Sequence, residues 1–341
     1  MSITKYLRKI LTSLFIKHST DFEKRLIQSE AGMGKTSMPD YPFVTVIMPN
    51  WNGRNDTVEC IYSLADLNYP KDKMELVIAD NGSHDGSVEA IMDVFSNIRT
   101  KYKWEHLKLI ENGKNIGAPA AYNRAIAGSD HNFDYLWKID NDIVVDPNSL
   151  VELVKVAELD KQIGIIGSKM LYHDYDGSHD TIWFWAGMVL PVMGGIGINF
   201  GKQEKDSDIF KGVRESGYVA GASCLIRKDE AINTFCEDYF VYFDDTDLCL
   251  QSKKRGYKCV VASKSKIWHK VSASTGAKSA FYVYYRTRNQ FILAKRNLSI
   301  IQCTAFLLIN SIKYILIFLI TPHRRSYLRG VYHGLVFMFA K

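Results

Sequence analysis

The side chains with the clearest chemical potential in this sequence are three groups of acidic residues and one histidine. In chain order they are Asp80, Asp140, Asp142, Asp244, Asp245, Asp247 and His269. Asp140 and Asp142 are one residue apart, and two carboxylates at that spacing can hold a hard divalent cation. Such a cation can in turn hold a diphosphate. The sequence therefore predicts a cation-dependent site for a phosphate-containing ligand.

The first acidic groups each end an apolar run with the length of a buried strand, as in LVIAD and YLWKID. Further runs of this kind alternate with helical patterns. The expected strands cover 43–49, 74–80, 107–112, 135–140 and 163–171, and the expected helices cover 56–67, 86–95, 119–127 and 147–159. This order predicts an α/β fold with a doubly wound parallel sheet. Ligands bind such sheets at the carboxyl ends of the strands, where Asp80 and Asp140 lie.

The pattern changes in the second half of the chain. Residues 172–227 are rich in Gly, Trp and Tyr and contain short β-like runs such as GYVAGASCLI. A helix is expected over 245–255, a late strand over 258–263, and a helix with an aromatic face over 280–296.

The order and spacing of these motifs resemble family 2 glycosyltransferases with the GT-A fold. The resemblance covers roughly residues 43–297 and is nearest to rhamnosyl- and galactofuranosyltransferase-like members that build bacterial surface polysaccharides. It implies a Rossmann-like, mostly parallel sheet flanked by helices. The first half would bind a nucleotide and the second half would shape an acceptor site. A Rossmann dehydrogenase is disfavoured, because PNWNGRND replaces the GxGxxG that it needs after the first strand.

The resemblance also assigns residues to the sugar donor. The loop after the first strand would contact the nucleotide, and Asp80 would contact its base or ribose, although a turn cap explains an aspartate there equally well. The segment from Asn115 would approach the diphosphate at a helix N-terminus. The expected donor-binding residues are Pro49, Asn50, Asn52, Asp80, Asn115, Gly117, Asp140 and Asn141.

Cation binding and catalysis are assigned in the same way. Asp140 and Asp142 form the DxD element, and with His269 they would hold Mn²⁺ or Mg²⁺. Asp245, the second acid of a DDxD element, would be the catalytic base that takes the proton from an acceptor hydroxyl. One base and no covalent nucleophile imply a single displacement with inversion. A cluster of acids that merely favours a helix N-terminus is the alternative for Asp244 to Asp247.

Charge and hydropathy set the two ends of the chain apart. No acidic residue follows Asp247, whereas 17 Lys and Arg do, and this predicts an anionic partner. The apolar segment 300–320 is as long as a membrane span but contains Lys313. It is interpreted with the following helix as lying on, or dipping into, a membrane leaflet; a true span and a soluble packing helix are the alternatives. Residues 5–17 form a basic amphipathic pattern that suits either a membrane surface or the protein's own domain.

The predicted domains are therefore an N-terminal helix and linker over 1–41, a GT-A domain over 42–279 and membrane-associating helices over 280–341. The predicted function is an inverting, metal-dependent glycosyltransferase using dTDP-rhamnose or a UDP-sugar. Its acceptor would be a cell-surface polysaccharide or a lipid-linked glycan. The enzyme itself would lie at the cytoplasmic face of the inner membrane, either peripherally or with shallow insertion. Nucleic acid is not expected as a partner. An inactive membrane-bound scaffold with the same fold is the alternative.

Overall fold

A computed structural model describes residues 3–17, 20–32, 40–130, 132–228, 234–271 and 279–340. The helices are α1 (Ile3–Lys17), α2 (Asp21–Gly32), α3 (Arg54–Ala65), α4 (Ser87–Tyr102), α5 (Ala118–Ala127), α6 (Ser149–Leu159), α7 (Asp244–Lys254), α8 (Ala280–Asn297), α9 (Ile300–Ile320) and α10 (Arg324–Phe339). The strands are β1 (Val44–Asn50), β2 (Met74–Asp80), β3 (Leu107–Glu111), β4 (Tyr135–Ile139), β5 (Ile143–Val145), β6 (Ile163–Tyr172), β7 (Ile182–Phe184), β8 (Ala186–Leu190), β9 (Ile196–Phe200), β10 (Val213–Glu215), β11 (Ser223–Arg227) and β12 (Lys258–His269).

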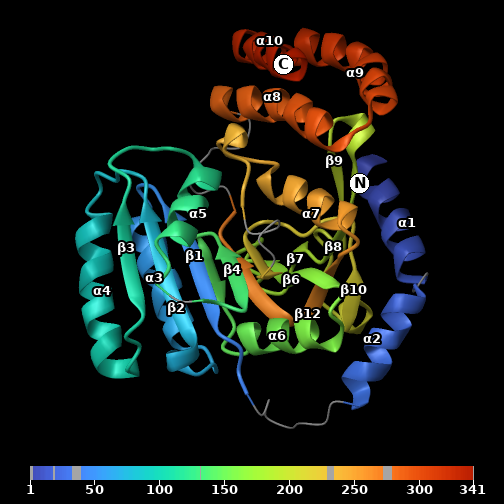
Figure 1. Cartoon of the computed structure of the whole chain (residues 1–341). Helices are drawn as coiled ribbons and strands as arrows, with labels where there is room; N and C mark the ends of the chain where they lie inside the picture. The colour runs from blue at the N-terminus through green and yellow to red at the C-terminus, as the bar shows by residue number, and fades with distance from the viewer. Residues whose placement is uncertain are drawn as a thin grey trace.

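The main sheet has the strand order β10-β12-β6-β11-β4-β1-β2-β3, flanked by helices (Figure 1). Strands β1 to β4 are parallel neighbours, as the buried apolar runs predict. Every residue of β2 is buried. A strand that is covered on both faces typically consists of a continuous run of mainly apolar residues. The carboxyl ends of β1, β2 and β4 therefore meet at one edge, where the candidate site lies. The predicted α/β fold with a mostly parallel sheet is confirmed.

One antiparallel strand interrupts the parallel part of the sheet. The fifth predicted strand, β6, runs in the expected direction but does not lie beside β4. Antiparallel β11 lies between them and pairs with both. Since β11 comes from the Gly-rich second half, this half completes the sheet rather than forming a separate domain. Strands β8 and β9 form a separate two-stranded hairpin.

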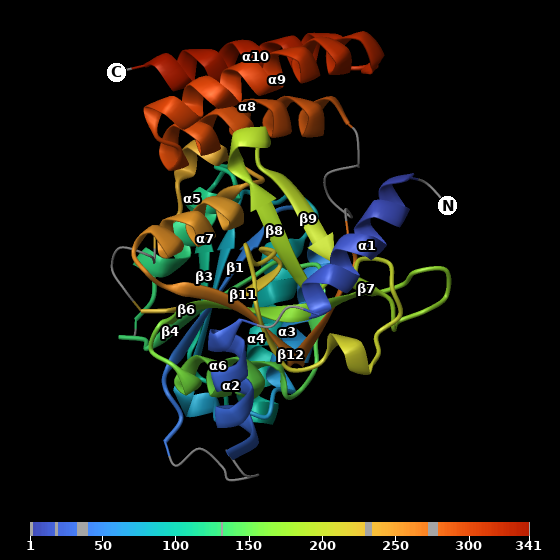
Figure 2. The ribbon, with the colours of Figure 1, turned by 90° about the vertical axis from the view of Figure 1, so that its right-hand side faces the viewer.

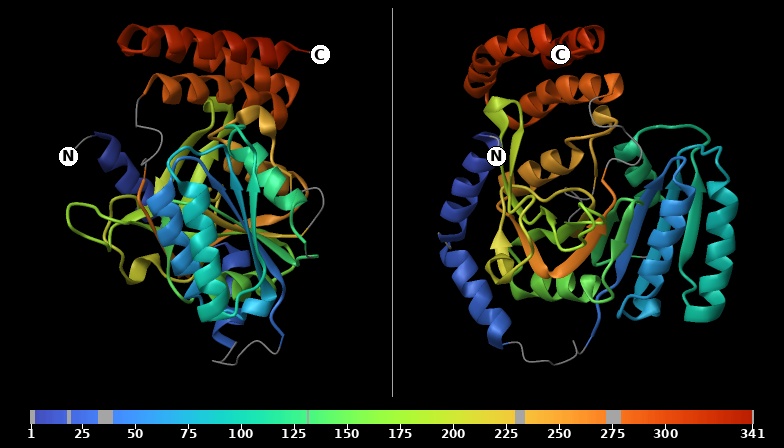
Figure 3. Two further views of the ribbon diagram at one scale, coloured as in Figure 1. Left: turned by 90° about the vertical axis from the view of Figure 1, so that its left-hand side faces the viewer. Right: turned by 180° about the vertical axis from the view of Figure 1, so that it is seen from behind.

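The N-terminal helices lie along one side of the sheet domain (Figure 3). Phe15 of α1 stacks on Phe200 of β9, with ring centroids 4.1 Å apart, while Leu11 and Leu14 are exposed. Helix α1 thus packs on its own domain and also presents apolar side chains outward. The region predicted as one helix and a linker over 1–41 contains a second helix, α2, which continues to Gly32 and buries Leu26 in the core. Residues Gly34 to Thr36, which bear a weak likeness to a phosphate-binding loop, lie outside the described residues.

The C-terminal helices α8, α9 and α10 form a layer above the sheet domain, and the β8–β9 hairpin reaches up to it (Figure 2). Helix α10 packs closely on α8 through two glycines. A Cβ at Gly330 would lie 2.8 Å from the carbonyl oxygen of Tyr284, and one at Gly334 would lie 2.3 Å from the Phe291 ring. Small residues four apart let two helix backbones approach, a common device of helix pairs in membranes.

Asn310 and Lys313, two polar residues within the apolar segment of α9, face the protein. Buried Asn310 donates to the carbonyl of Val192, and Lys313 donates to the carbonyl of Met193 and to Gln290, at 2.9, 3.2 and 3.2 Å. Within the described residues, α9 is the one helix long and apolar enough to cross a membrane. Its other side, together with α10, carries exposed apolar residues, which we call the apolar face. They are Ile300, Ile301, Leu308, Ile309, Ile312, Ile315, Leu316, Leu319, Ile320, Leu328, Tyr332, Val336 and Phe339.

Candidate active site

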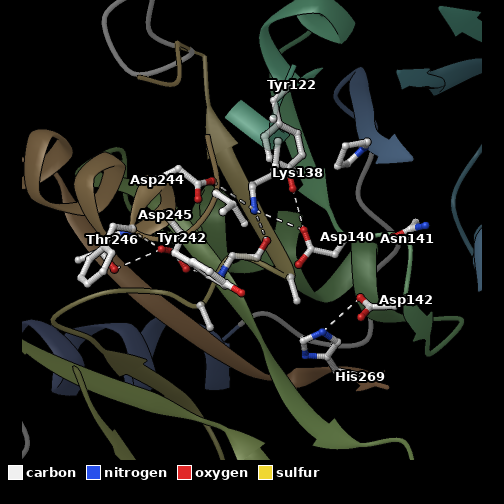
Figure 4. Close-up of a pocket in the computed structure, with 18 of the residues that line it drawn as sticks. Tyr122, Lys138, Asp140, Asn141, Asp142, Tyr242, Asp244, Asp245, Thr246 and His269 are labelled. Atoms are coloured by element: carbon white, nitrogen blue, oxygen red, sulfur yellow. Dashed lines mark hydrogen bonds and ion pairs between the residues drawn. The ribbon is translucent and has the colours of Figure 1, made fainter. Parts of the chain in front are cut away.

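A cavity of about 800 Å³ opens where the ends of β1, β4 and β12 meet the start of α7. The hairpin β8–β9 and helix α8 complete its wall. Most of the predicted site residues line it, among them both acids of the DxD element, His269 and Asp245 (Figure 4). The structure therefore brings together side chains that are more than 100 positions apart in the chain.

Asp140, Asp142 and His269 form a compact group whose ligand atoms all lie within 4.8 Å of one another. His269 Nε2 lies 3.2 Å from Asp142 Oδ1. Burial would lower the pKa of His269, but the hydrogen bond and charge of Asp142 raise it above its ordinary value. Burial opposes ionisation of Asp142 as well, and contact with His269 lowers its pKa overall. Two carboxylates and an imidazole at this spacing fit Mn²⁺, which accepts oxygen and nitrogen ligands.

Strand pairing places this histidine. Short strand β5 follows the DxD element and pairs antiparallel with the end of β12, with His269 opposite Ile143. The amide of Lys270 donates to the carbonyl of Asp142 at 3.0 Å. The Trp183 ring meets the His269 ring edge to face, with centroids 4.8 Å apart. His269 is thus fixed from three sides, while its Nδ1 is buried without a hydrogen-bond partner in the described part of the chain.

The three acids that open α7 have different surroundings. Asp245 lines the cavity, and its carboxylate accepts from the amides of Gly221 and Thr246 at 2.8 and 2.6 Å. Asp244 is more deeply buried, and burial is the main cause that raises its pKa to about 6. Asp247 points away from the cavity and binds Arg296 and Asn297 of α8. Only two of the three acids can therefore reach a substrate.

Lys138, which the sequence reasoning missed, connects the two acidic groups (Figure 4). Its Nζ lies 3.6 Å from Asp140 and 3.9 Å from Asp244, and it donates to the carbonyl of Gly221 at 2.6 Å. Burial lowers its pKa, but Tyr122, Asp140 and Asp244 raise it well above the ordinary value. A lysine in the otherwise apolar strand YLWKI was the available signal, because an unpaired buried ammonium is costly.

The loop before α7 is strained and held in place by α8. Phe240, Tyr242 and Phe243 all have positive φ, between 62° and 70°. Bulky side chains rarely adopt this conformation, which persists only where surrounding contacts enforce it. Asn289 of α8 is fully buried and donates to the carbonyls of Tyr239, Val241 and Tyr242 at 3.0, 2.7 and 3.1 Å. This side chain fixes the approach to the acids of α7.

On the predicted donor side, polar residues form a continuous network. Asn50 donates to Asp80 at 2.6 Å and accepts from Thr57 and Asn141 at 2.8 and 3.1 Å. Asp80 also accepts from the amide and hydroxyl of Ser83, and it is only 1% exposed. It lies behind the cavity wall, bonded as a turn cap. The predicted contact of Asp80 with a base stays a prediction. Pro49 and Asn52 do line the cavity.

Asn115 and Gly117 also line the cavity, but the backbone amides beside them at the start of α5 already have hydrogen-bond partners within the protein. Asn115 accepts from the amide of Gly117 at 3.0 Å, and the first amide of α5, at Ala118, donates to the carbonyl of Phe240 at 2.7 Å. A Cβ at Gly117, where φ is 88°, would lie 2.6 Å from that same carbonyl oxygen. The glycine is therefore needed for the approach of the strained loop, a reason that the sequence did not reveal.

Solved structures share this architecture across nearly the whole chain. The mannosyltransferase PcManGT from Pyrobaculum calidifontis, in complex with GDP-Man and Mn²⁺, aligns over 92% of this chain and 93% of its own, with a TM-score of 0.53 and 16% identity. A fragment of S. aureus TarS in complex with UDP-GlcNAc aligns over 86% and 81%, with a TM-score of 0.53 and 15% identity. The protein has the GT-A glycosyltransferase fold.

Sequence comparisons match part of the chain to known glycosyltransferases. Residues 45–197 match the model of glycosyl transferase family 2. The chain is similar to the N-acetylglucosaminyl-diphospho-decaprenol L-rhamnosyltransferase of Mycobacterium tuberculosis, with 26% identity over 250 residues, 66% of this chain and 76% of the relative. An 88-residue stretch, 26% of this chain and 27% of the relative, is 33% identical to the glycosyltransferase AglE of Haloferax volcanii. The match to glycosyl transferase family 2 covers the part of the chain that holds β1 to β8 and the DxD element.

Proposed function

We propose that this glycosyltransferase moves a sugar from a nucleotide-sugar donor to a lipid-linked glycan, with inversion at the anomeric carbon. The observation that carries the proposal is the convergence of the Asp140–Asp142–His269 group and Asp245 in one cavity. The similarity to a rhamnosyltransferase that acts on a diphospho-decaprenol favours dTDP-rhamnose as the donor, with a UDP-sugar as the alternative. The same similarity favours a lipid-linked acceptor.

In this proposal the two acidic groups have different tasks. A divalent cation bound by Asp140, Asp142 and His269 would act as a Lewis acid that stabilises the charge of the departing nucleoside diphosphate. Lys138 compensates the charge of Asp140 and Asp244 beneath the site. Asp245 takes the proton of the acceptor hydroxyl as its oxygen attacks the anomeric carbon. Two backbone amides hold the Asp245 carboxylate in one orientation, so that it meets the acceptor without first being ordered.

The apolar face supports a position on a membrane surface, which we propose to be the cytoplasmic face of the inner membrane. Asn310 and Lys313 bind the hairpin tip, and this holds the inner side of α9 against the protein. The side chains of Arg324, Arg325 and Arg329 are exposed beside the apolar face and suit anionic lipid headgroups. Helices α9 and α10 would then lie in the interface with apolar side chains inserted.

Product analysis with a panel of nucleotide sugars and a lipid-linked glycan acceptor tests the function. We expect transfer from one donor class, dependent on Mn²⁺ or Mg²⁺, and a product with the opposite anomeric configuration. Donor binding without any transfer to such acceptors would favour the inactive scaffold instead.

A liposome-binding experiment tests the proposed membrane position. Replacing exposed Ile312, Leu316 and Leu319 by Ser should release the protein from liposomes. Unchanged liposome binding by this variant would contradict the surface orientation.

A further inference from the structure

Two cations in the cavity have no acidic partner among the residues that the structure describes. Lys202, just after β9, and Arg286, on α8, both line the cavity. Neither makes an ion pair within the described ranges of the chain, although acids abound elsewhere in the same cavity. Arg286 instead lies over the rings of Phe243 and Tyr282, with its guanidinium carbon 5.3 and 5.4 Å from the ring centroids. Lys202 lies over Trp183, with its Nζ 5.6 Å from the centroid.

These cations are close enough to repel each other. The pKa of Lys202 is lowered by burial and then by the positive charges of Arg8 and Arg286. Arg8 belongs to α1, so three separate elements bring positive charge to this side of the cavity. Grouped cations without acids are unfavourable in a folded protein unless an anion joins them, since each pays for desolvation without a compensating charge. The group is therefore suited to a multiply charged anion.

Both cations come from other elements than the strands that carry the predicted donor residues, since Lys202 follows β9 and Arg286 belongs to α8. Arg286 lies over Phe243, the residue directly before the acids of α7, and Tyr218 also lines the cavity. The tyrosine hydroxyl donates to Asn199 of β9, which also lines the cavity. Lys202 follows the hairpin and lies over Trp183, whose ring also meets that of His269, while Arg286 lies beside the loop that precedes Asp245. We assign an anion at these cations to the molecule that Asp245 deprotonates, and the test below distinguishes it from the diphosphate of the donor.

Apolar side chains continue from this side towards the C-terminal layer. Val189, Phe243 and Phe281 line the cavity together with Arg286, and Phe281 is also exposed to solvent. Helix α8 carries Arg286 and packs against α10, whose outer side belongs to the apolar face. A molecule with a diphosphate at the cations and a hydrocarbon chain along this path would reach the proposed membrane surface.

We infer that Lys202 and Arg286 form a binding site for the diphosphate of a lipid-diphosphate-linked acceptor, with Arg8 adding long-range attraction. This inference rests on the proposed function, because it names the acceptor class of the same active site. Arg is suited to the task, since its planar guanidinium donates two parallel hydrogen bonds to phosphate oxygens. The site would hold the acceptor by its diphosphate and leave the sugar beside Asp245.

The test is a binding titration of the full-length protein in detergent micelles, with farnesyl diphosphate as the probe and farnesol as its uncharged counterpart. EDTA is present throughout, so that no cation at Asp140 and Asp142 can bind the diphosphate. We expect farnesyl diphosphate to bind at least 10-fold more tightly than farnesol. Lys202→Ala and Arg286→Gln should each weaken its binding by roughly 10-fold and leave farnesol binding unchanged. Lys205→Ala is the matched control, because Lys205 is an exposed lysine three residues from Lys202.

Three results would overturn the inference. They are equal affinity for the diphosphate and the alcohol, equal weakening by Lys205→Ala, or binding of inorganic diphosphate as tight as that of farnesyl diphosphate. A separate titration of dTDP and UDP with Mn²⁺ covers the donor, and a loss there as large as for farnesyl diphosphate would assign the cations to the donor instead. Because the titration needs neither donor nor turnover, its failure is distinct from absence of glycosyl transfer.

Discussion

The two sides of the cavity are built differently. On the side of β1 and β2, Asn50, Asp80, Ser83 and Asn141 bond to one another, and their side chains have few free positions. On the side of the hairpin and α8, Lys202 and Arg286 lie over aromatic rings and make no ion pair with the described part of the chain. A network whose polar side chains already hydrogen-bond to one another keeps its shape with or without a ligand. Cations without an ionic partner gain the most electrostatic stabilisation when an anionic ligand binds. We therefore expect ligand binding to change the second side more than the first.

This contrast separates residues that set the rate from residues that set the acceptor affinity. The acids between the two sides should affect transfer most strongly. Changes in the supporting loop and in buried charges should affect shape and stability. The following predictions test this ranking, beginning with the largest expected effect.

Replacing Asp142 by Ala should abolish transfer and cation-dependent nucleotide binding, because the carboxylate is one of three ligands within 4.8 Å. The measurement is nucleotide affinity by calorimetry with and without Mn²⁺, alongside product formation. The fold should persist, as Asp142 lies at a strand end. Exposed Asp174→Ala is the control and should behave as wild type. Cation-dependent binding that survives in Asp142→Ala would remove this residue from the cation site.

Replacing Asp245 by Asn should lower the rate of transfer by roughly 10²–10⁴-fold, the usual contribution of a positioned base. Donor affinity should change little, because the predicted donor contacts lie on the opposite side of the cavity. Single-turnover kinetics together with donor titration make the separation. Asp244→Asn is the necessary comparison, since the raised pKa of Asp244 also suits a base. If transfer fails only in Asp244→Asn, the base is Asp244.

Replacing Asn289 by Ala should release the strained loop before α7 and destabilise the protein by about 1–3 kcal/mol, because the carbonyls of Val241 and Tyr242 lose this donor. The carbonyl of Tyr239 loses it as well but keeps Arg288 as a donor. We expect a lower denaturation midpoint and a reduced transfer rate with nearly unchanged donor affinity. Asn297→Ala, on the same helix, removes a bond to Asp247 rather than to the loop and provides the control. Equal rate losses in both variants would indicate a general effect of α8 rather than a role of the loop.

The smallest effect concerns stability and pH at Asp244. Its pKa rises from 3.8 to about 6 on folding, so the folded state holds the proton more tightly than the unfolded state. This contribution to stability is fully present below pH 4 and is lost as the pH rises through 6. Asp244→Asn, which cannot ionise, should therefore be more stable than wild type at pH 7.5, by roughly 1–3 kcal/mol, and similar to it at pH 4. Urea denaturation at both pH values measures the difference. A less stable variant at pH 7.5 would show that Lys138 depends on this charge.

The sequence by itself determined much of this protein. The apolar runs gave β1 to β4 and β6, because strands buried on both faces need uninterrupted apolar residues. The acids at the ends of these runs marked the site, since the carboxyl ends of parallel strands share one edge. The order of the motifs led to the GT-A fold, which solved structures confirm.

Only the tertiary structure decided the rest, because it depends on contacts between distant segments. The pairing of β5 with β12 places His269 beside Asp142, and no local pattern encodes that register. The burial of Asp80 and the outward direction of Asp247 likewise follow from neighbours elsewhere in the chain. Lys313, which argued against a simple membrane span, is placed by the hairpin tip that accepts its hydrogen bond. Periodicity reports which residues prefer burial, whereas the partners of buried polar groups are fixed only when the whole chain has packed.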